Sequence, residues 1–151
     1  MKGLIRKIKL ADLNKCAEIL ERSYNQSPYN EKFTSGIGYK YLKIKFDYCA
    51  DNSFVIEENK NVIGFVMINL SYWNGGWQAI IEEIVIDEDK QNQGYGKKIL
   101  GYASDYLKGL GVRSLMLWGR KDAGAYKFYL KNGFVEDENM MVMFKNFDEQ
   151  F

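Results

Sequence analysis

The first fifty residues combine a short strand pattern with two helical patterns. Leu4–Leu10 is predicted to be a strand, and Asp12 is a candidate N-cap for a helix that ends before Ser27. Residues 25–38 contain a proline and two glycines, which predicts a loop. The apolar face of the first helix consists of Leu13, Cys16, Ala17, Leu20 and Tyr24, and a second helix after the loop carries Tyr39, Leu42, Phe46 and Cys49.

The middle of the chain has the pattern of consecutive strands joined by tight turns. Ser53–Glu57 and Val62–Leu70 are rich in β-branched and aromatic residues and flank a polar turn, which predicts a hairpin. Asn74-Gly75-Gly76 is a second turn signal, and a third strand is expected at Trp77–Ile86.

The last third alternates between helix and strand. Apolar positions three and four residues apart predict a helix from Gly94 to Leu110, with Gly111 as its stop signal. A strand at Arg113–Trp118, a short helix at Asp122–Asn132 and a last strand at Met140–Phe147 are expected to follow.

These elements predict one α/β domain over residues 1–151, layered in the α+β manner. Hairpin-linked strands run antiparallel and strands linked through a helix run parallel, so the sheet is expected to be mixed, with helices on both faces. The length of 151 residues suits a single domain.

Composition narrows the classes of function. A net charge of +1 gives no strong field for nucleic acid or an anionic membrane, so neither is expected as a partner. The chain has no histidine, and its two cysteines are too few for a zinc site, so no metal is expected. Cys16 and Cys49 lie on apolar faces and are expected to be buried free thiols. No apolar run approaches the length of a membrane span and the N-terminus lacks a secretory pattern, so a cytoplasmic location is expected.

The strongest chemical signal is the Gly-Tyr-Gly turn at Gly94–Gly96, between a predicted strand and a long helix. Glycines allow the backbone to approach a ligand closely, and the first N–H groups of a helix favour an anion. The turn therefore predicts a phosphate or diphosphate site, although a tight turn that binds nothing has the same pattern. Its spacing fits neither the Rossmann nor the Walker motif.

Two segments resemble signatures of the GCN5-related N-acetyltransferase (GNAT) superfamily. Gln91–Gly96 is similar to Gln/Arg-x-x-Gly-x-Gly/Ala, and Ala125–Phe134 is similar to Ala-x-x-Phe-Tyr-x-x-x-Gly-Phe. The likeness covers nearly the whole chain. It implies a mostly antiparallel GNAT-like sheet with a splayed central strand pair, and acetyl-coenzyme A (acetyl-CoA) as cosubstrate.

The resemblance also implies the residues that contact acetyl-CoA. The strand segment Ile84, Val85 and Ile86 would bind the pantetheine arm and the acetyl carbonyl. Asp122 stands where the family often has Asn, so either a cofactor contact or helix capping is expected of it. The diphosphate would be held by backbone N–H groups of Gln91, Asn92, Gln93, Gly94, Tyr95, Gly96 and Lys97.

Tyr129 and Glu82 are the candidate catalytic residues. Tyr129 matches the family's tyrosine near the cofactor sulfur, where it would protonate the leaving thiolate; the alternative is a core aromatic beside Phe128. Without histidine, a carboxylate is the natural base for the amine. Strict alternation places Glu82 on the strand face of Ile84 and Ile86, with Glu83 opposite, and a β-bulge would exchange the two.

Aromatic residues are frequent where the acceptor is expected to bind. Such side chains can line a slot for a cationic amine, or form ordinary core and rim. Carboxylates at Glu31, Asp47 and Asp51 favour a polyamine or an aminosugar. The aromatic residues are Tyr24, Tyr29, Tyr39, Tyr41, Phe46, Tyr48, Tyr72, Trp73 and Trp77.

The sequence thus predicts an N-acetyltransferase that transfers acetyl directly to a primary amine of a small molecule or a peptide. A non-catalytic acyl-CoA-binding sensor or partner module is the alternative from a different class, and a domain with an empty glycine turn is a third. An exposed strand edge at Met140–Phe144 would allow two copies to pair as a homodimer.

Overall fold

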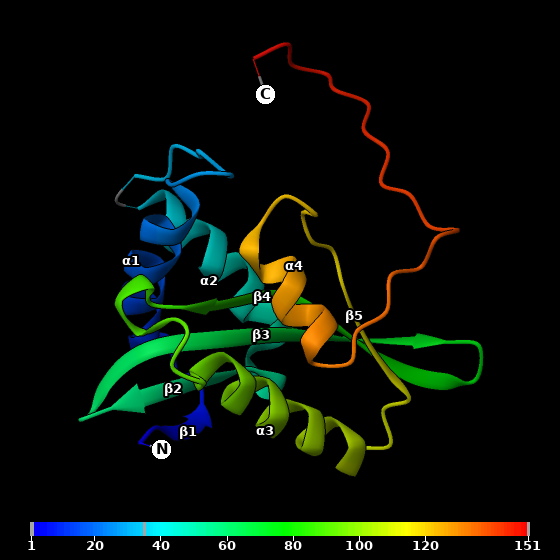
Figure 1. Cartoon of the computed structure of the whole chain (residues 1–151), viewed down its shortest axis with the longest axis horizontal. Coiled ribbons are helices and arrows are strands. Elements are labelled where there is room, and N and C mark those ends of the chain that lie inside the picture. Colours follow the sequence, from blue (N-terminus) through cyan, green and yellow to red (C-terminus); the bar gives the residue numbers. More distant parts are fainter. Residues whose placement is uncertain (1, 35, 151) are drawn as a thin grey trace. The chain divides into compact units, whose positions relative to one another are not determined.

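The computed structural model describes residues 2–34 and 36–150 and divides into two compact units, Met1–Gly119 and Arg120–Phe151 (Figure 1). The first unit contains a five-stranded sheet and three α-helices, and the second contains one helix and a long C-terminal segment. Within the described residues, no helix is long and apolar enough to cross a membrane. The single-domain organisation stays a prediction.

The sheet has the strand order β1-β2-β3-β4-β5. The first four strands pair antiparallel and β5 pairs parallel with β4, which confirms the mixed, mostly antiparallel sheet. Asn59 and Lys60, both at positive φ, form the turn of the β2–β3 hairpin. The strands are β1 (Leu4–Lys7), β2 (Phe54–Glu58), β3 (Asn61–Trp73), β4 (Gly76–Ile86) and β5 (Ser114–Leu117).

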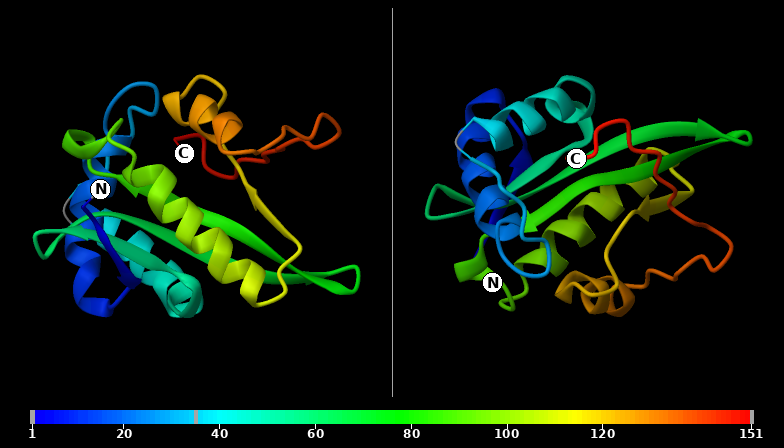
Figure 2. Two further views of the ribbon diagram at one scale, coloured as in Figure 1. Left: turned by 60° about the horizontal axis from the view of Figure 1, so that its bottom comes forward. Right: turned by 90° about the horizontal axis from the view of Figure 1, so that it is seen from above.

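Helices cover both faces of this sheet, as predicted (Figure 2). Helices α1 (Leu13–Tyr24) and α2 (Ile37–Cys49) pack together on one face, over a core that includes Leu20, Leu42 and Phe65. Helix α3 (Tyr95–Gly109) packs on the other face against β2, β3 and β4, with Ile99 fully buried. Three short 3-10 turns, η1 (Leu10–Asp12), η2 (Ala50–Asn52) and η3 (Glu88–Lys90), connect these elements. Cys16 and Cys49 are free and buried, as expected.

The first predicted strand and the predicted cap of α1 need correction. Strand β1 ends at Lys7, because η1 turns the chain before α1. The carboxylate of Asp12 makes no capping hydrogen bond to α1. It instead accepts from the N–H of Lys9 at 2.7 Å and from both terminal nitrogens of Arg6 at 2.8 Å. Because the Arg6 guanidinium binds both oxygens of the carboxylate, Asp12 does not cap α1.

The predicted last strand at Met140–Phe147 is wrong. Helix α4 (Gly124–Lys131) ends before Gly133, and the described residues after it contain no strand. A strand forms only where a neighbouring backbone pairs with it, and five consecutive apolar residues do not supply that partner. The exposed fractions lie between 62% and 92% for Met140, Met141, Val142, Met143, Phe144 and Phe147.

Strands β4 and β5 pair over only part of their length. The parallel ladder joins Gln78–Ile81 to Ser114–Leu117, and β5 then ends, whereas β4 continues to Ile86. The half of β4 from Glu82 onward therefore has no partner on that edge among the residues of the first unit that the structure describes. This parting is the splayed strand pair that the family resemblance implies.

Ser53 holds η2 against β3 at the level where β4 changes register. Its side chain is fully buried, donates to the carbonyl of Cys49 at 2.6 Å and accepts from the N–H of Ile68 at 3.0 Å. Ile68 pairs with Ile81 directly beside the register shift in the β3–β4 ladder. The serine hydroxyl therefore satisfies a buried N–H just beyond the end of the β2–β3 ladder.

Replacing Ser53 by alanine is expected to lower the free energy of unfolding by about 1–3 kcal/mol, because the Ile68 N–H would stay buried without an acceptor. Urea unfolding followed by circular dichroism measures the change. Ser104→Ala is the control, because the Ser104 hydroxyl only donates back to Leu100 within α3. Equal stability of the two variants would contradict this role of Ser53.

Candidate active site

An extra residue in β4 brings two carboxylates toward the same helix. Met67 of β3 pairs with Glu83 and Ile68 pairs with Ile81, so Glu82 is the inserted residue of a β-bulge. Glu82 accepts from Lys45 and Glu83 accepts from Tyr41, and these two donors are one turn apart on α2. The expectation that Glu82 shares a face with Ile84 and Ile86, with Glu83 opposite, is therefore wrong. The bulge interrupts the alternation on which it was based.

Glu83 is enclosed by tyrosines. Only 9% of the residue is exposed, and its carboxylate accepts from the hydroxyls of Tyr24, at 2.9 Å, and Tyr41. Burial raises the pKa of Glu83 above its ordinary value, although both hydroxyls partly offset this effect. Burial, with the nearby charge of Glu83, also raises the pKa of each tyrosine. The hydroxyls consequently remain donors at neutral pH.

Glu82 forms a half-buried ion pair with Lys45 at 2.9 Å. Burial acts to lower the pKa of Lys45, but the hydrogen bond and charge of Glu82 outweigh it, and the pKa of Lys45 is raised. The ammonium of Lys45 also lies 4.9 Å from the centre of the Tyr41 ring. A cation, two carboxylates and two phenols are thus gathered beside the parted half of β4.

Aromatic rings extend from this group into the loop before α2. Tyr24 is 4.6 Å from Tyr29 and 6.0 Å from Phe33, measured between ring centres, and Phe33 is 6.2 Å from Tyr41. Tyr24, Tyr29 and Tyr41 of the predicted aromatic set therefore lie together. Tyr72, Trp73 and Trp77 are exposed at the far end of the β3–β4 hairpin. Asp47 is engaged by Lys43 on α2.

The glycine turn opens α3 in the predicted manner. Asn92 and Gly94 adopt positive φ angles of 59° and 87°, and Gly94 is the N-cap of α3. The first α-helical hydrogen bond runs from the N–H of Lys98 to the carbonyl of Gly94, at 3.0 Å. The N–H groups of Tyr95, Gly96 and Lys97 precede that bond and have no acceptor within the helix. An anion at this turn would meet several backbone donors together with the positive end of the helix dipole.

Side chains of this loop bind the protein itself. Gln91 donates to the carbonyl of Ile86 at 3.0 Å, Gln93 donates to the carbonyl of Asp89 at 3.1 Å, and Tyr95 donates to Glu58 at 2.7 Å. Lys98 donates to the carbonyl of Gly3. Backbone groups and the exposed Lys97 are therefore what this loop offers to a ligand.

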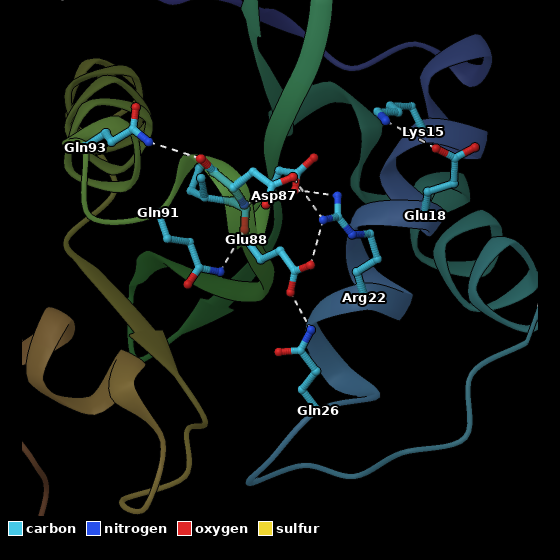
Figure 3. Close-up of polar contacts among 10 residues, drawn as sticks. Lys15, Glu18, Arg22, Gln26, Asp87, Glu88, Gln91 and Gln93 are labelled. Carbon is cyan, nitrogen blue, oxygen red and sulfur yellow. Dashed lines mark hydrogen bonds and ion pairs between the residues drawn. The ribbon is translucent and has the colours of Figure 1, made fainter.

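The last turn of α1 reaches the start of the same loop (Figure 3). Arg22 lies within hydrogen-bond distance of Asp87, Glu88 and Asp89, and Gln26 donates to Glu88. Neither Arg22, Gln26 nor Lys45 was identified from the sequence. No local pattern in the sequence identifies them, because each contact joins residues that are far apart in the chain.

The second unit contains Asp122 and Tyr129. Asp122 accepts from Arg120 at 2.8 and 2.7 Å, and α4 begins after Ala123 without a side-chain cap, so helix capping by Asp122 is wrong. The hydrogen bond from Arg120 lowers the pKa of Asp122. The Tyr129 ring packs edge-on against Phe128 and Phe134, with ring centres 5.6 and 5.5 Å apart. Groups of three or more potential metal ligands are absent from residues 2–34 and 36–150.

The sequence and fold match known acetyltransferases. The model of the acetyltransferase (GNAT) family matches residues 13–134. An N-acetyltransferase of Methanocaldococcus jannaschii, described as uncharacterized, is 31% identical over 141 residues. That alignment covers 89% of this chain and 61% of the relative, so the chain spans less than two thirds of the relative's length.

Solved structures share the fold at low sequence identity. A possible acetyltransferase from Clostridium difficile 630 aligns with a TM-score of 0.81 at 15% identity, over 98% of this chain and all of that one. An aminoglycoside acetyltransferase from an uncultured soil metagenomic sample, in complex with sisomicin, aligns with a TM-score of 0.72 at 17% identity, over 97% of each chain. These matches show the mixed α/β fold with an open, mostly antiparallel sheet. By its sequence match the chain belongs to the acetyltransferase (GNAT) family.

Replacing Glu83 by glutamine is expected to change how stability depends on pH. The folded protein raises the pKa of Glu83 above its unfolded value of about 4.3, so the unfolded state loses this proton first as the pH rises. The wild type thereby loses stability above about pH 4.5, and the variant lacks this loss. Urea unfolding between pH 4.5 and 8 should show that the free energy of unfolding of Glu83→Gln rises relative to that of the wild type as the pH rises.

The exposed carboxylate of Glu18 on α1 provides the control for this series. Glu18→Gln should keep a constant stability difference from the wild type over the same pH range. A constant difference for Glu83→Gln as well would show that Glu83 does not titrate as its burial requires.

Proposed function

We propose that the protein is an acetyl-CoA-dependent N-acetyltransferase that moves the acetyl group directly to a primary amine. The proposal rests on two neighbouring features of the chain. The unpaired half of β4 is followed by the Gly94 turn, where the first N–H groups of α3 are available to an anion. Family membership supports the same reaction.

Residues of the first unit could bind two parts of acetyl-CoA, the diphosphate and the pantetheine arm. Backbone N–H groups between Gln91 and Lys97 would hold the diphosphate, since they lie at the start of α3 and the loop is exposed. The unpaired edge of β4, from Ile84 to Ile86, would take the amide groups of the pantetheine arm as a neighbouring strand takes a backbone. A fixed N–H beside the acetyl carbonyl would stabilise the oxyanion that forms on attack.

Glu82 is our candidate for the base that accepts the proton of the incoming ammonium, directly or through water. An alkylammonium has a pKa of about 10, so the amine needs a proton acceptor before it can attack. Glu83 is the second candidate, and its raised pKa favours proton uptake, whereas its two tyrosine contacts occupy the carboxylate. Tyr129 is the candidate acid for the leaving thiolate, supported by its place in the Ala125–Phe134 motif.

For the acceptor we propose a small cationic amine, such as an aminosugar or a polyamine. The rings of Tyr24, Tyr29 and Tyr41 lie together, and two of these tyrosines contact the carboxylate of Glu83, which suits a positive charge. The family relative solved with sisomicin, an aminoglycoside acetyltransferase, is consistent with this choice. A peptide amine is the other acceptor class. The two free thiols favour the reducing cytoplasm as the site of action.

The reaction is tested by mixing the protein with acetyl-CoA and a panel of polyamines, aminosugars and peptides, and following the release of free thiol. Glu82→Gln and Tyr129→Phe are each expected to lower turnover by about 10–10⁴-fold, the scale of acid–base catalysis. An unchanged rate removes that residue from the mechanism. Coenzyme A (CoA) binding without thiol release over the panel would favour a non-catalytic binding module.

Replacing Gly94 by alanine is expected to weaken CoA binding, because the N-cap glycine has a φ of 87° and an added Cβ strains the turn that aims the N–H groups. Gly111, at the other end of α3, has a φ of 78°, and a Cβ added there would meet no atom within 4 Å. Gly94→Ala and Gly111→Ala should each lose about 1 kcal/mol of stability.

Calorimetric titration with CoA then separates the two glycines. Only Gly94→Ala should raise the dissociation constant, by about tenfold or more. Equal affinities for both variants would place the diphosphate elsewhere.

A further inference from the structure

The last turn of α1 makes an ion-pair network with the three residues that precede the glycine loop (Figure 3). One terminal nitrogen of Arg22 lies 2.8 Å from Asp87, and the other lies 2.6 Å from Glu88 and 3.1 Å from Asp89. These partners are 65 to 67 residues away in the chain. One guanidinium therefore joins three consecutive carboxylates to a distant helix.

These carboxylates oppose the binding of an anion to the loop that follows them. Asp87, Glu88 and Asp89 precede the Gly94 turn by five to seven residues, and each negative charge repels a diphosphate through solvent. Lys90, the nearest cation in the sequence, is paired with Glu58 at 2.5 Å. Arg22 contacts all three carboxylates, and its single positive charge offsets part of their negative charge.

The same contacts fix the backbone at the start of the loop. Asp87 is 9% exposed, its N–H donates to the carbonyl of Ile63 at 2.8 Å, and its carboxylate accepts from the N–H of Asp89 at 3.4 Å. The N–H of Lys90 donates to the carbonyl of Asp87, which closes η3. A guanidinium that holds Asp87 therefore also holds the turn from which the loop begins.

Gln26 and Tyr24 extend this connection on either side. Gln26 donates to the second oxygen of Glu88, and Tyr24 donates to Glu83, four residues before Asp87. The end of α1 thus contacts both the candidate catalytic stretch of β4 and the turn before the candidate diphosphate loop.

We propose that Arg22 is a positioning residue for the diphosphate of acetyl-CoA: its positive charge offsets part of the negative charge of Asp87, Glu88 and Asp89, and it holds η3 so that the backbone N–H groups after it face the anion. The inference rests on the proposed function. Arg22 acts through the carboxylates and does not itself take part in acetyl transfer.

The test compares CoA binding by the full chain and its variants in calorimetric titrations at low and high salt. Arg22→Ala is expected to raise the dissociation constant about five- to tenfold at low salt, with a smaller rise at high salt, because the network is partly exposed and screened by ions. Arg22→Lys keeps the positive charge but lacks the two terminal nitrogens of the guanidinium, and it should recover part of the affinity. Lys15→Ala is the matched control, since Lys15 is a cation on the same helix and its ion pair is with Glu18, away from η3 (Figure 3).

A second comparison separates positioning from a merely structural role. Arg22→Ala should raise the KM for acetyl-CoA with little change in kcat, and should leave kcat/KM unchanged for S-acetylpantetheine, which lacks the diphosphate. Adding Glu88→Gln and Asp89→Asn to Arg22→Ala should restore the part of the CoA affinity that was lost through repulsion, because two of the three negative charges are then removed. Thermal unfolding of each variant checks that the fold is retained.

The outcomes distinguish this inference from the proposed function. If the wild type binds no CoA, the proposed function fails and the inference fails with it. If the wild type binds CoA and Arg22→Ala binds it equally well, only the inference is overturned. An equal loss for S-acetylpantetheine, or no recovery in the triple variant, would also overturn it.

Discussion

The pairing of β4 along its length is the constraint on which the rest of the first unit depends. From Gln78 to Ile81 this strand has partners on both edges, and beyond Ile81 it pairs only with β3 among the described residues of the first unit. The inserted residue Glu82 lies at that transition, so the same point in the chain frees one edge and turns two carboxylates toward α2. A regular strand would place one of them on the opposite face.

The burial of charge beside this transition is stabilised by specific partners. Glu83 retains a raised pKa in spite of two phenolic donors, which indicates that desolvation outweighs the hydrogen bonds. Glu82 and Lys45 compensate each other at 2.9 Å. These contacts tie β4 to α1 and α2, while η3 is tied to α1 through Arg22. The segment from Glu82 to Asp89 is therefore fixed from one side by two helices.

Periodicity was sufficient to predict most elements of the fold, because an apolar face has to be buried against the sheet. Helix α3 and its glycine at each end were predicted to within a residue or two, since positive φ angles at Gly94 and Gly111 demand that residue type. The bulge at Glu82 could not be located, because an inserted residue leaves the local pattern of residue types unchanged. The last strand was wrong because the run at Met140–Phe144 gives no information on its partner.

The candidate site was also predicted only in part. The Gln91–Gly96 motif identified a loop whose observed geometry suits an anion, because the motif encodes backbone conformation. The partners of Asp12 and Asp122 were misjudged, since each carboxylate had a helix start beside it in sequence and an arginine nearby in space. Contacts such as Arg22 with Asp87 join residues 65 positions apart, and one sequence contains no local signal for them.

Amide hydrogen exchange with and without CoA tests the central claim most directly. The account predicts slower exchange in two places, the backbone N–H groups between Gln91 and Lys97 and those of β4 beyond the bulge. Unchanged exchange at both places in the presence of saturating CoA, or protection confined to the far end of the β3–β4 hairpin around Asn74, would contradict it.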